Sequence, residues 1–369
     1  MDHERIFTET PKIAIWQRID ILTTHNGVIE ELTRQSQLAG LGLNDELLNE
    51  KAKGITFCIR SARDLFNQSD ARNLTPSIIS IYYGTYNLLS ALLIANVNNP
   101  LTLSDVENFS KNGGHGLKSI YRTATGNIAE NEFIYCCPNG FFKEYLDRML
   151  FDTKKIITPN YYRKIDKVPE EQIHKIVSLK ELLARIPELK NIYSEIFKEQ
   201  PYYLNYYASK NYKVEPASFK VSINKFQNTE YLEADLINNI LSIPEEYQFE
   251  YRKKTNKDSS KEEFRCDDVL AQYITLKPKY NSPIAASCTL KPLLTIDDVF
   301  LLYFKLFYLL SIWVRYRPNL WREVYEGKYD HFRPLFSILQ ESAERILPNL
   351  FLNKFYKRNI LFASHSYLS

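Results

Sequence analysis

The chain has 369 residues, enough for about two domains. Its residues are 44% hydrophobic and 14% aromatic, which is sufficient material for a large core and excludes a disordered chain. The 47 basic and 44 acidic residues leave a net charge of +3, which argues against a dedicated nucleic-acid or membrane-binding surface.

The chain begins with a charged segment that lacks an apolar core, so no signal peptide is expected. Apolar residues then recur at helical spacing over residues 13–36 and 44–66. The next predicted helix starts with Thr75 as its cap, followed by Pro76, and ends before Asn98-Asn99-Pro100. These patterns predict a helical N-terminal lobe over residues 1–200.

Two capping boxes are predicted in the same lobe, Ser104 with Glu107 and Ser178 with Glu181. The helix that follows the second box should run to Phe197 and bend at Pro187.

The middle of the chain changes to period two. Apolar and polar residues alternate in Phe219–Ile223, Tyr247–Tyr251 and Ile284–Leu290, which predicts half-buried strands. Residues 252–261 form a polar loop between them. We therefore expect a small antiparallel sheet in a β-rich segment, 201–293, with a C-terminal helical lobe, 294–369, packing on the rest. The expected class is α+β, mostly helical, with two helical lobes and the sheet between them.

The C-terminal lobe is predicted to be helical from Thr295 to about Phe362. It contains an apolar run, Val299–Val314, that Lys305 interrupts. This run has 16 residues, whereas a membrane span needs about 20, so a buried core helix is expected.

The five cysteines show neither CxxC nor metal-ligand spacing: Cys58, Cys136, Cys137, Cys266 and Cys288. We expect buried free thiols in a reducing compartment, and hence a cytoplasmic protein. The sequence has no P-loop, no GxGxxG after a strand, no HExxH and no GxSxG. We therefore expect no cofactor and no metal.

The most suggestive candidate is His115, in the turn Lys111-Asn-Gly-Gly-His-Gly116. Glycines allow backbone amides to approach an anion, and an imidazole titrates near neutral pH. His115 could act as a general base or contact a phosphate, with Lys111 and Lys118 as cationic neighbours. Alternatively, the glycines only permit a tight turn and His115 hydrogen-bonds a helix end.

Further anion-binding candidates are arginines. Arg315 and Arg317 precede Pro318 at a helix end, where they could clamp a phosphate or carboxylate, or cap the helix dipole. Arg63 could face the same region or form an internal ion pair. The tyrosines between Tyr202 and Tyr212 could stack exposed bases or pack on the predicted sheet.

Seven segments in order resemble the YaaC-like family. They are FCIRSARDLF (57–66), TPSIISIYYGTYNLLSALL (75–93), GGHGL (113–117), NGFF (139–142), SLKELLARIPELKNIY (178–193), YLLSIWVRYRPNLWREV (308–324) and RILPNLFLNKF (345–355). The resemblance covers residues 50–365.

The helix followed by His-Gly is also similar, more loosely, to HEPN-type domains. That resemblance implies a helical bundle and, in active members, a metal-independent ribonuclease built on an Arg-x4–6-His motif. In this chain the preceding basic residue is Lys111, with three residues between it and His115.

Three functional hypotheses follow. The first is a non-catalytic interaction or regulatory protein that acts with a protein partner or as a homo-oligomer, because no catalytic set is complete. The HEPN-type resemblance implies a role in bacterial stress or antiphage defence. The second is a ribonuclease that uses His115 as acid or base, with Lys111 or an arginine stabilising the phosphate. The third is a sensor of a small anion or nucleotide that uses His115 and Arg315.

Overall fold

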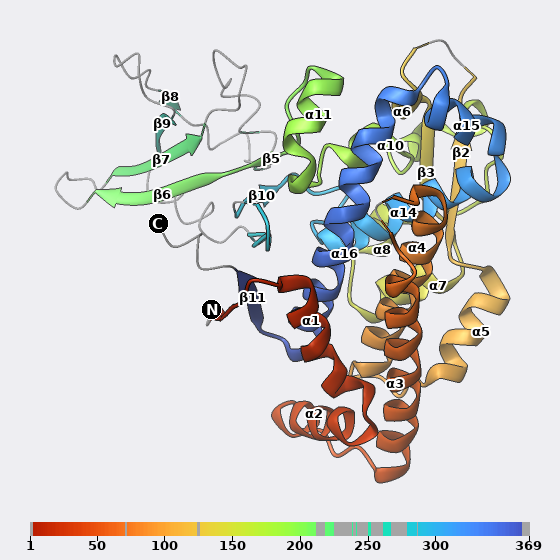
Figure 1. The fold of residues 1–369 in the computed structure, drawn as a ribbon, viewed down its shortest axis with the longest axis vertical. Helices are drawn as coiled ribbons and strands as arrows, with labels where there is room; N and C mark the ends of the chain where they lie inside the picture. The colour runs from red at the N-terminus through yellow and green to blue at the C-terminus, as the bar shows by residue number, and fades with distance from the viewer. Residues whose placement is uncertain are drawn as a thin grey trace. The chain divides into compact units, whose positions relative to one another are not determined.

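The computed structural model describes residues 3–70, 72–123, 126–211, 218–224, 238, 241, 250–251, 261–266, 279–285 and 287–363. The chain forms two compact units. The larger combines Met1–Leu182 with Leu294–Ser369, and the smaller is Leu183–Leu293. The fold is α+β and mostly helical with small antiparallel sheets, which confirms the predicted class (Figure 1).

Long helices build the larger unit. They are α1 (Pro11–Asp20), α2 (His25–Leu38), α3 (Asp45–Asn67), α4 (Leu74–Ala95), α5 (Leu103–Gly113), α7 (Phe141–Arg148), α14 (Val299–Tyr316), α15 (Pro318–Glu326) and α16 (Arg333–Tyr356). Helix α4 packs against α3, α14 and α16 (Figure 1). A Cβ on Gly84 would lie 2.8 Å from the Phe66 ring, so this glycine lets α3 and α4 approach closely.

Shorter helical segments connect these helices. They are η1 (Ile21–Thr23), α6 (Ile128–Asn131), α8 (Thr153–Ile156), η2 (Ile165–Lys167), α9 (Glu170–Ile173), α10 (Leu179–Leu183) and η4 (Asp330–Phe332).

Helices α4 and α14 are long and apolar enough to cross a membrane, but 78% of each apolar window is buried inside the protein. This burial confirms the core-helix prediction for Val299–Val314. The Lys305 side chain within α14 is also buried, and its ammonium lies 5.5 Å from the centre of the Phe142 ring.

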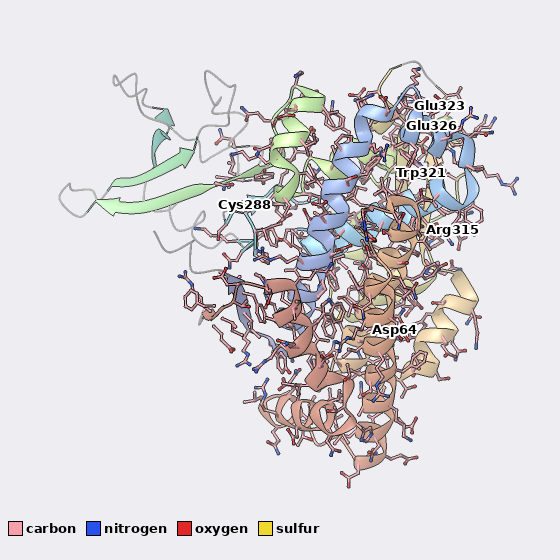
Figure 2. All side chains as sticks on the ribbon, viewed as in Figure 1. Asp64, Cys288, Arg315, Trp321, Glu323 and Glu326 are labelled. Atoms are coloured by element: carbon pink, nitrogen blue, oxygen red, sulfur yellow. The ribbon has the colours of Figure 1, made fainter. Side chains whose placement is uncertain are left out.

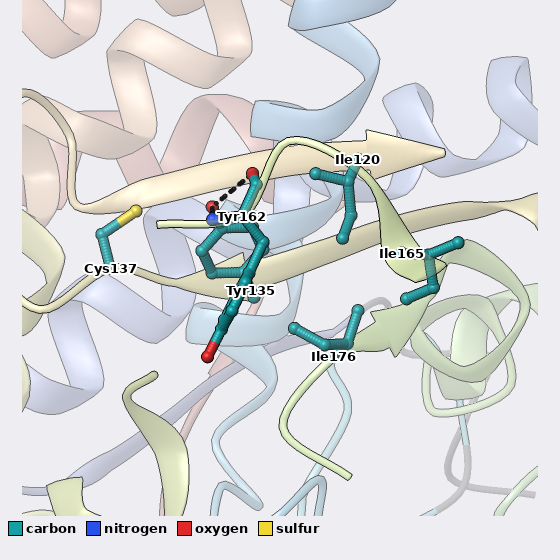
Figure 3. Close-up of a cluster of buried hydrophobic side chains, with 6 residues drawn as sticks. All are labelled: Ile120, Tyr135, Cys137, Tyr162, Ile165 and Ile176. Atoms are coloured by element: carbon teal, nitrogen blue, oxygen red, sulfur yellow. Dashed lines mark hydrogen bonds between the residues drawn. The ribbon is translucent and has the colours of Figure 1, made fainter. Parts of the chain in front are cut away.

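A three-stranded antiparallel sheet also belongs to the larger unit, in the order β2 (Leu117–Tyr121), β3 (Glu132–Cys136) and β4 (Val177–Ser178). The helical prediction for residues 1–200 missed it. Four of the five β3 residues are buried. Because buried and exposed residues do not alternate along β3, the period-two signal of a half-buried strand is absent. Tyr135 of β3 lies in a buried cluster whose other members are Ile120, Cys137, Tyr162, Ile165 and Ile176 (Figure 3).

The two ends of the described chain pair with each other. Strand β1 (His3–Phe7) lies parallel to β11 (Asn359–Ala363). The prediction of helix to about Phe362 is therefore wrong. Helix α16 ends at Tyr356, and Lys357 adopts the left-handed conformation with φ 54°, which stops the helix before β11.

The helix caps partly follow the sequence prediction. Ser178 and Glu181 form the predicted capping box through reciprocal hydrogen bonds of 2.9 and 3.2 Å. The box of α5 is Thr102 with Asp105, not Ser104 with Glu107. Helix α4 begins at Leu74, and the Thr75 hydroxyl accepts a hydrogen bond from the Trp321 indole at 2.8 Å instead of capping the helix.

The smaller unit contains η3 (Pro187–Leu189), α11 (Lys190–Phe197) and the strands β5 (Tyr203–Leu204), β6 (Tyr206–Asn211), β7 (Ser218–Asn224), β8 (Glu250–Tyr251), β9 (Lys261–Cys266) and β10 (Thr289–Leu290). One antiparallel sheet has the order β6-β7-β9-β8, and β5 pairs with β10. The predicted strand Phe219–Ile223 lies in β7. The predicted helix up to Phe197 is interrupted, not merely bent, at Pro187.

Several predictions for this unit fall outside the described residues, namely Tyr212, 247–249 and most of the 252–261 loop. Of the described tyrosines, Tyr203 is buried, and the ring centre of Tyr202 lies 4.9 Å from the Arg185 guanidinium and 5.2 Å from the Lys291 ammonium.

Candidate anion site around His115 and Arg315

Three tyrosines of α4 surround the His115 imidazole. The ring centre of His115 lies 5.4 Å from Tyr82, 5.9 Å from Tyr83 and 5.2 Å from Tyr86, each in an edge-to-face arrangement. Residues three and four apart are neighbours on a helix surface, and Tyr86 follows Tyr83 by three residues and Tyr82 by four. The α4 helix therefore presents an aromatic wall, Tyr82, Tyr83 and Tyr86, to the turn that carries His115.

The glycine turn holds His115 by backbone contacts with the start of α7. The carbonyls of Gly114 and His115 accept hydrogen bonds from the amides of Phe141 and Phe142, at 3.0 and 3.1 Å. A Cβ on Gly140, where φ is +102°, would lie 2.4 Å from the Gly113 carbonyl oxygen. The glycines thus allow the two turns to pack backbone against backbone. Because the carbonyls of Gly114 and His115 are used in this contact, the His115 side chain is the group of the turn that could contact a ligand.

The His115 imidazole is neutral at physiological pH. Burial, together with the positive charge of Arg315, lowers its pKa from 6.5 to about 4. Its Nδ1 atom is buried and has no hydrogen-bond partner among the described residues. The buried Tyr82 hydroxyl is likewise unpartnered in that part of the chain, and burial raises its pKa well above the ordinary value.

The cation that acts on the His115 pKa is Arg315, at the C-terminal end of α14 (Figure 2). Its guanidinium donates to the Ser311 carbonyl at 3.2 Å, the Ser311 hydroxyl at 3.0 Å and the Tyr83 hydroxyl at 3.0 Å. It lies 5.9, 5.6 and 5.0 Å from the rings of Tyr82, Tyr83 and Tyr316. All of these acceptors are neutral, so within the described chain no carboxylate compensates its charge.

Arg317 occupies a different environment. Its guanidinium donates to both carboxylate oxygens of Glu132, at 2.7 and 2.6 Å, and the Trp313 indole donates to the same carboxylate at 3.1 Å. The Glu132 side chain is only 4% exposed. Burial raises the pKa of Glu132, and Arg317 opposes that rise. We call these residues, Glu132, Trp313 and Arg317, the closed cluster.

Two more predicted site residues are also paired elsewhere. Arg63 forms an ion pair with Asp20. Lys111 lies 3.7 Å from Glu107 on its own helix, with 70% of its side chain exposed. Of the predicted site residues, the structure therefore brings only His115 and Arg315 to the same group of tyrosines. We call the five residues Tyr82, Tyr83, Tyr86, His115 and Arg315 the open cluster.

The sequence prediction missed the tyrosines and Glu132. The tyrosines had a readable signal, because their spacing places them on one helix side. Glu132 had none, since its arginine partner is 185 residues away. Among the residues that the structure describes, no three of the types His, Cys, Asp and Glu gather as metal ligands would. Four of the five cysteines, Cys58, Cys136, Cys137 and Cys288, are buried free thiols, as predicted.

A comparison with protein families identifies the chain. The model of the family described as YaaC-like Protein matches residues 28–355. The chain belongs to the YaaC-like family. This confirms the resemblance seen in the sequence, and the matched region includes both clusters of this YaaC-like protein. No curated protein and no solved structure matches the chain.

Proposed function

We propose that this YaaC-like protein is a non-catalytic regulatory protein that binds a small anion at the open cluster. The observation that carries the proposal is the Arg315 guanidinium, which is partly buried and contacts only neutral oxygens and aromatic rings. A buried cation is costly unless an opposite charge or a full set of hydrogen bonds compensates it. An anion would supply that compensation.

The donors of the open cluster suit an anion. A guanidinium has five N–H groups, and three hydrogen bonds leave two of them unused in the described structure. The Tyr82 hydroxyl is a further donor, and a neutral imidazole can donate from Nδ1. Buried polar atoms are usually hydrogen-bonded, and the Tyr82 hydroxyl and His115 Nδ1 are two such atoms beside Arg315 that have no partner among the described residues.

A thermal-shift assay tests the proposal. We expect inorganic phosphate or dimethyl phosphate, at ionic strength matched with chloride, to raise the Tm of the wild type, because a ligand stabilises the state that binds it. Arg315→Gln should abolish this rise. Arg322→Gln is the matched control, because Arg322 is 68% exposed on the neighbouring helix α15 and should leave the rise unchanged.

Two results would contradict the proposal. One is the absence of a Tm rise with either anion in the wild type. The other is an equal rise in Arg315→Gln, which would place binding elsewhere on the protein.

The geometry gives the ribonuclease hypothesis less support. A general acid or base works best with a pKa near the operating pH, whereas that of His115 is about 4. Lys111 is engaged with Glu107. Incubation of the purified protein with RNA in the absence of metal tests this hypothesis, and cleavage that disappears in His115→Ala would establish it.

A protein partner, a cytoplasmic location and a role in stress or antiphage defence remain parts of the proposal. The partner is supported by exposed tyrosines on the larger unit, Tyr121, Tyr161 and Tyr316, since aromatic residues are enriched in interfaces. Size-exclusion chromatography with light scattering would detect a homo-oligomer. Phage plating on cells with and without the protein would test the defence role.

A further inference from the structure

We infer that the ligand of the open cluster is a small nucleotide that carries a phosphodiester, such as a cyclic nucleotide. This inference rests on the proposed function and adds the chemical class of the ligand. It depends on two observations, the charge that the open cluster can compensate and the exposed aromatic ring beside Arg315.

The charge of the open cluster is +1. Arg315 is the cation, the His115 imidazole is neutral at pH 7, and burial raises the pKa of the Tyr82 and Tyr86 hydroxyls above the ordinary value. The Glu107 carboxylate also acts on Tyr86 electrostatically. It is paired with Lys111, so the two side chains together add no net charge. A phosphodiester carries one negative charge, whereas a phosphomonoester carries nearly two at this pH. The single guanidinium therefore matches a phosphodiester.

The aromatic ring is that of Tyr316, which is 68% exposed. It ends α14, and the Arg315 guanidinium lies 5.0 Å from its ring centre. An exposed tyrosine next to an anion site offers a surface on which a nucleobase can stack, because every base has a flat π face. A base on Tyr316 and a phosphate at Arg315 would then belong to the same small molecule.

A small molecule fits better than a nucleic-acid strand. Strands are bound along grooves in which several cations track successive phosphates. Here the net charge of the whole chain is +3, and Arg317 is already paired with Glu132. The one unpaired guanidinium of the open cluster serves a single phosphate.

Isothermal titration calorimetry at pH 7.5 tests this inference. The titrants are dimethyl phosphate, 3′,5′-cyclic AMP, AMP and a short single-stranded RNA. We expect cyclic AMP to bind about tenfold or more tightly than dimethyl phosphate, the usual effect of stacking one base. AMP should bind more weakly than cyclic AMP because its second negative charge is uncompensated.

Tyr316→Ala separates the base from the phosphate. It should remove the advantage of cyclic AMP and leave the affinity for dimethyl phosphate within about twofold. Tyr121→Ala is the matched control. Tyr121 is a 51% exposed tyrosine that also lies against an arginine, Arg317 at 4.2 Å, and its removal should change neither affinity.

The outcomes distinguish the inference from the proposed function. The nucleotide inference is overturned if dimethyl phosphate binds through Arg315 but cyclic AMP binds no more tightly. It is also overturned if cyclic AMP keeps its higher affinity in Tyr316→Ala. In both cases the anion site stands. Tighter binding of AMP than of cyclic AMP, or of RNA per phosphate, also overturns the nucleotide inference. If no titrant binds the folded wild type, the proposed function itself is contradicted.

Discussion

The closed and open clusters lie at the same end of α14, and their arginines are two residues apart. In the closed cluster, Arg317 and Trp313 satisfy the buried carboxylate of Glu132. In the open cluster, Arg315 has no carboxylate among the described residues, and His115 Nδ1 and the Tyr82 hydroxyl have no partner there. The contrast separates two uses of a partly buried arginine. A completed charge pair fixes the fold, and an incomplete set of donors is available to a ligand.

The largest expected effect is on the closed cluster. Arg317→Ala leaves the Glu132 carboxylate buried and unpaired, which should lower the free energy of unfolding by about 3–5 kcal/mol. Arg315→Ala removes three hydrogen bonds to neutral oxygens but also an uncompensated charge, so it should cost about 1 kcal/mol or less. Urea denaturation of both variants measures the difference. Equal losses in the two variants would remove the distinction between the clusters.

The second effect tests whether the His115 turn is a fixed support for the open cluster. Gly140→Ala places a Cβ 2.4 Å from the Gly113 carbonyl in a backbone conformation that only glycine adopts readily, which should cost about 3 kcal/mol or more. Gly114→Ala is the control. Its φ is also positive, at +62°, but its Cβ would meet no atom within 4 Å, so the substitution should cost about 1–2 kcal/mol. A Gly114 variant as unstable as the Gly140 variant would contradict the packing explanation.

The third effect concerns pH. The pKa of His115 is about 4 in the folded protein and 6.5 without burial. Between these two pKa values the unfolded chain binds the proton more tightly than the folded chain does. The free energy of unfolding is therefore highest above pH 6.5 as far as His115 is concerned, and it decreases as the pH falls toward 4. The loss between pH 7.5 and 4.5 should be about 2–3 kcal/mol.

His115→Phe should flatten this part of the stability profile, which denaturation at a series of pH values measures. His331→Gln is the control, because His331 is exposed, and should retain the wild-type slope. A wild-type slope in His115→Phe would show that the imidazole is not buried in its neutral form.

The smallest effect is expected at Lys111. Its ammonium forms an exposed i,i+4 pair with Glu107, which is worth about 0.5 kcal/mol or less. Lys111→Ala should therefore change neither the unfolding midpoint nor the anion-induced rise in Tm by a measurable amount. Loss of the anion response in this variant would extend the open cluster to Lys111 and favour the phosphate role predicted for it from the sequence.

The sequence predicts the long helices, the β7 strand, the buried α14 and the His115 turn, because each has a local signal of period, cap or glycine content. It does not predict β2 and β3, since β3 lacks alternation. The sequence also does not predict that Arg315 and Arg317 have different partners. Both stand at the end of the same predicted helix, and only the folded chain shows that Glu132, 185 residues from Arg317, pairs with Arg317.

The most direct test of the open cluster is the response of its imidazole to an anion. A long-range ¹H–¹⁵N correlation spectrum resolves the six histidines, and His115→Phe assigns the His115 signals by their disappearance. On addition of dimethyl phosphate, the His115 ring nitrogens should shift in the wild type and in Arg322→Gln, and should stay in place in Arg315→Gln. Unchanged His115 signals in the wild type, or an equal shift in Arg315→Gln, would contradict an anion site between His115 and Arg315.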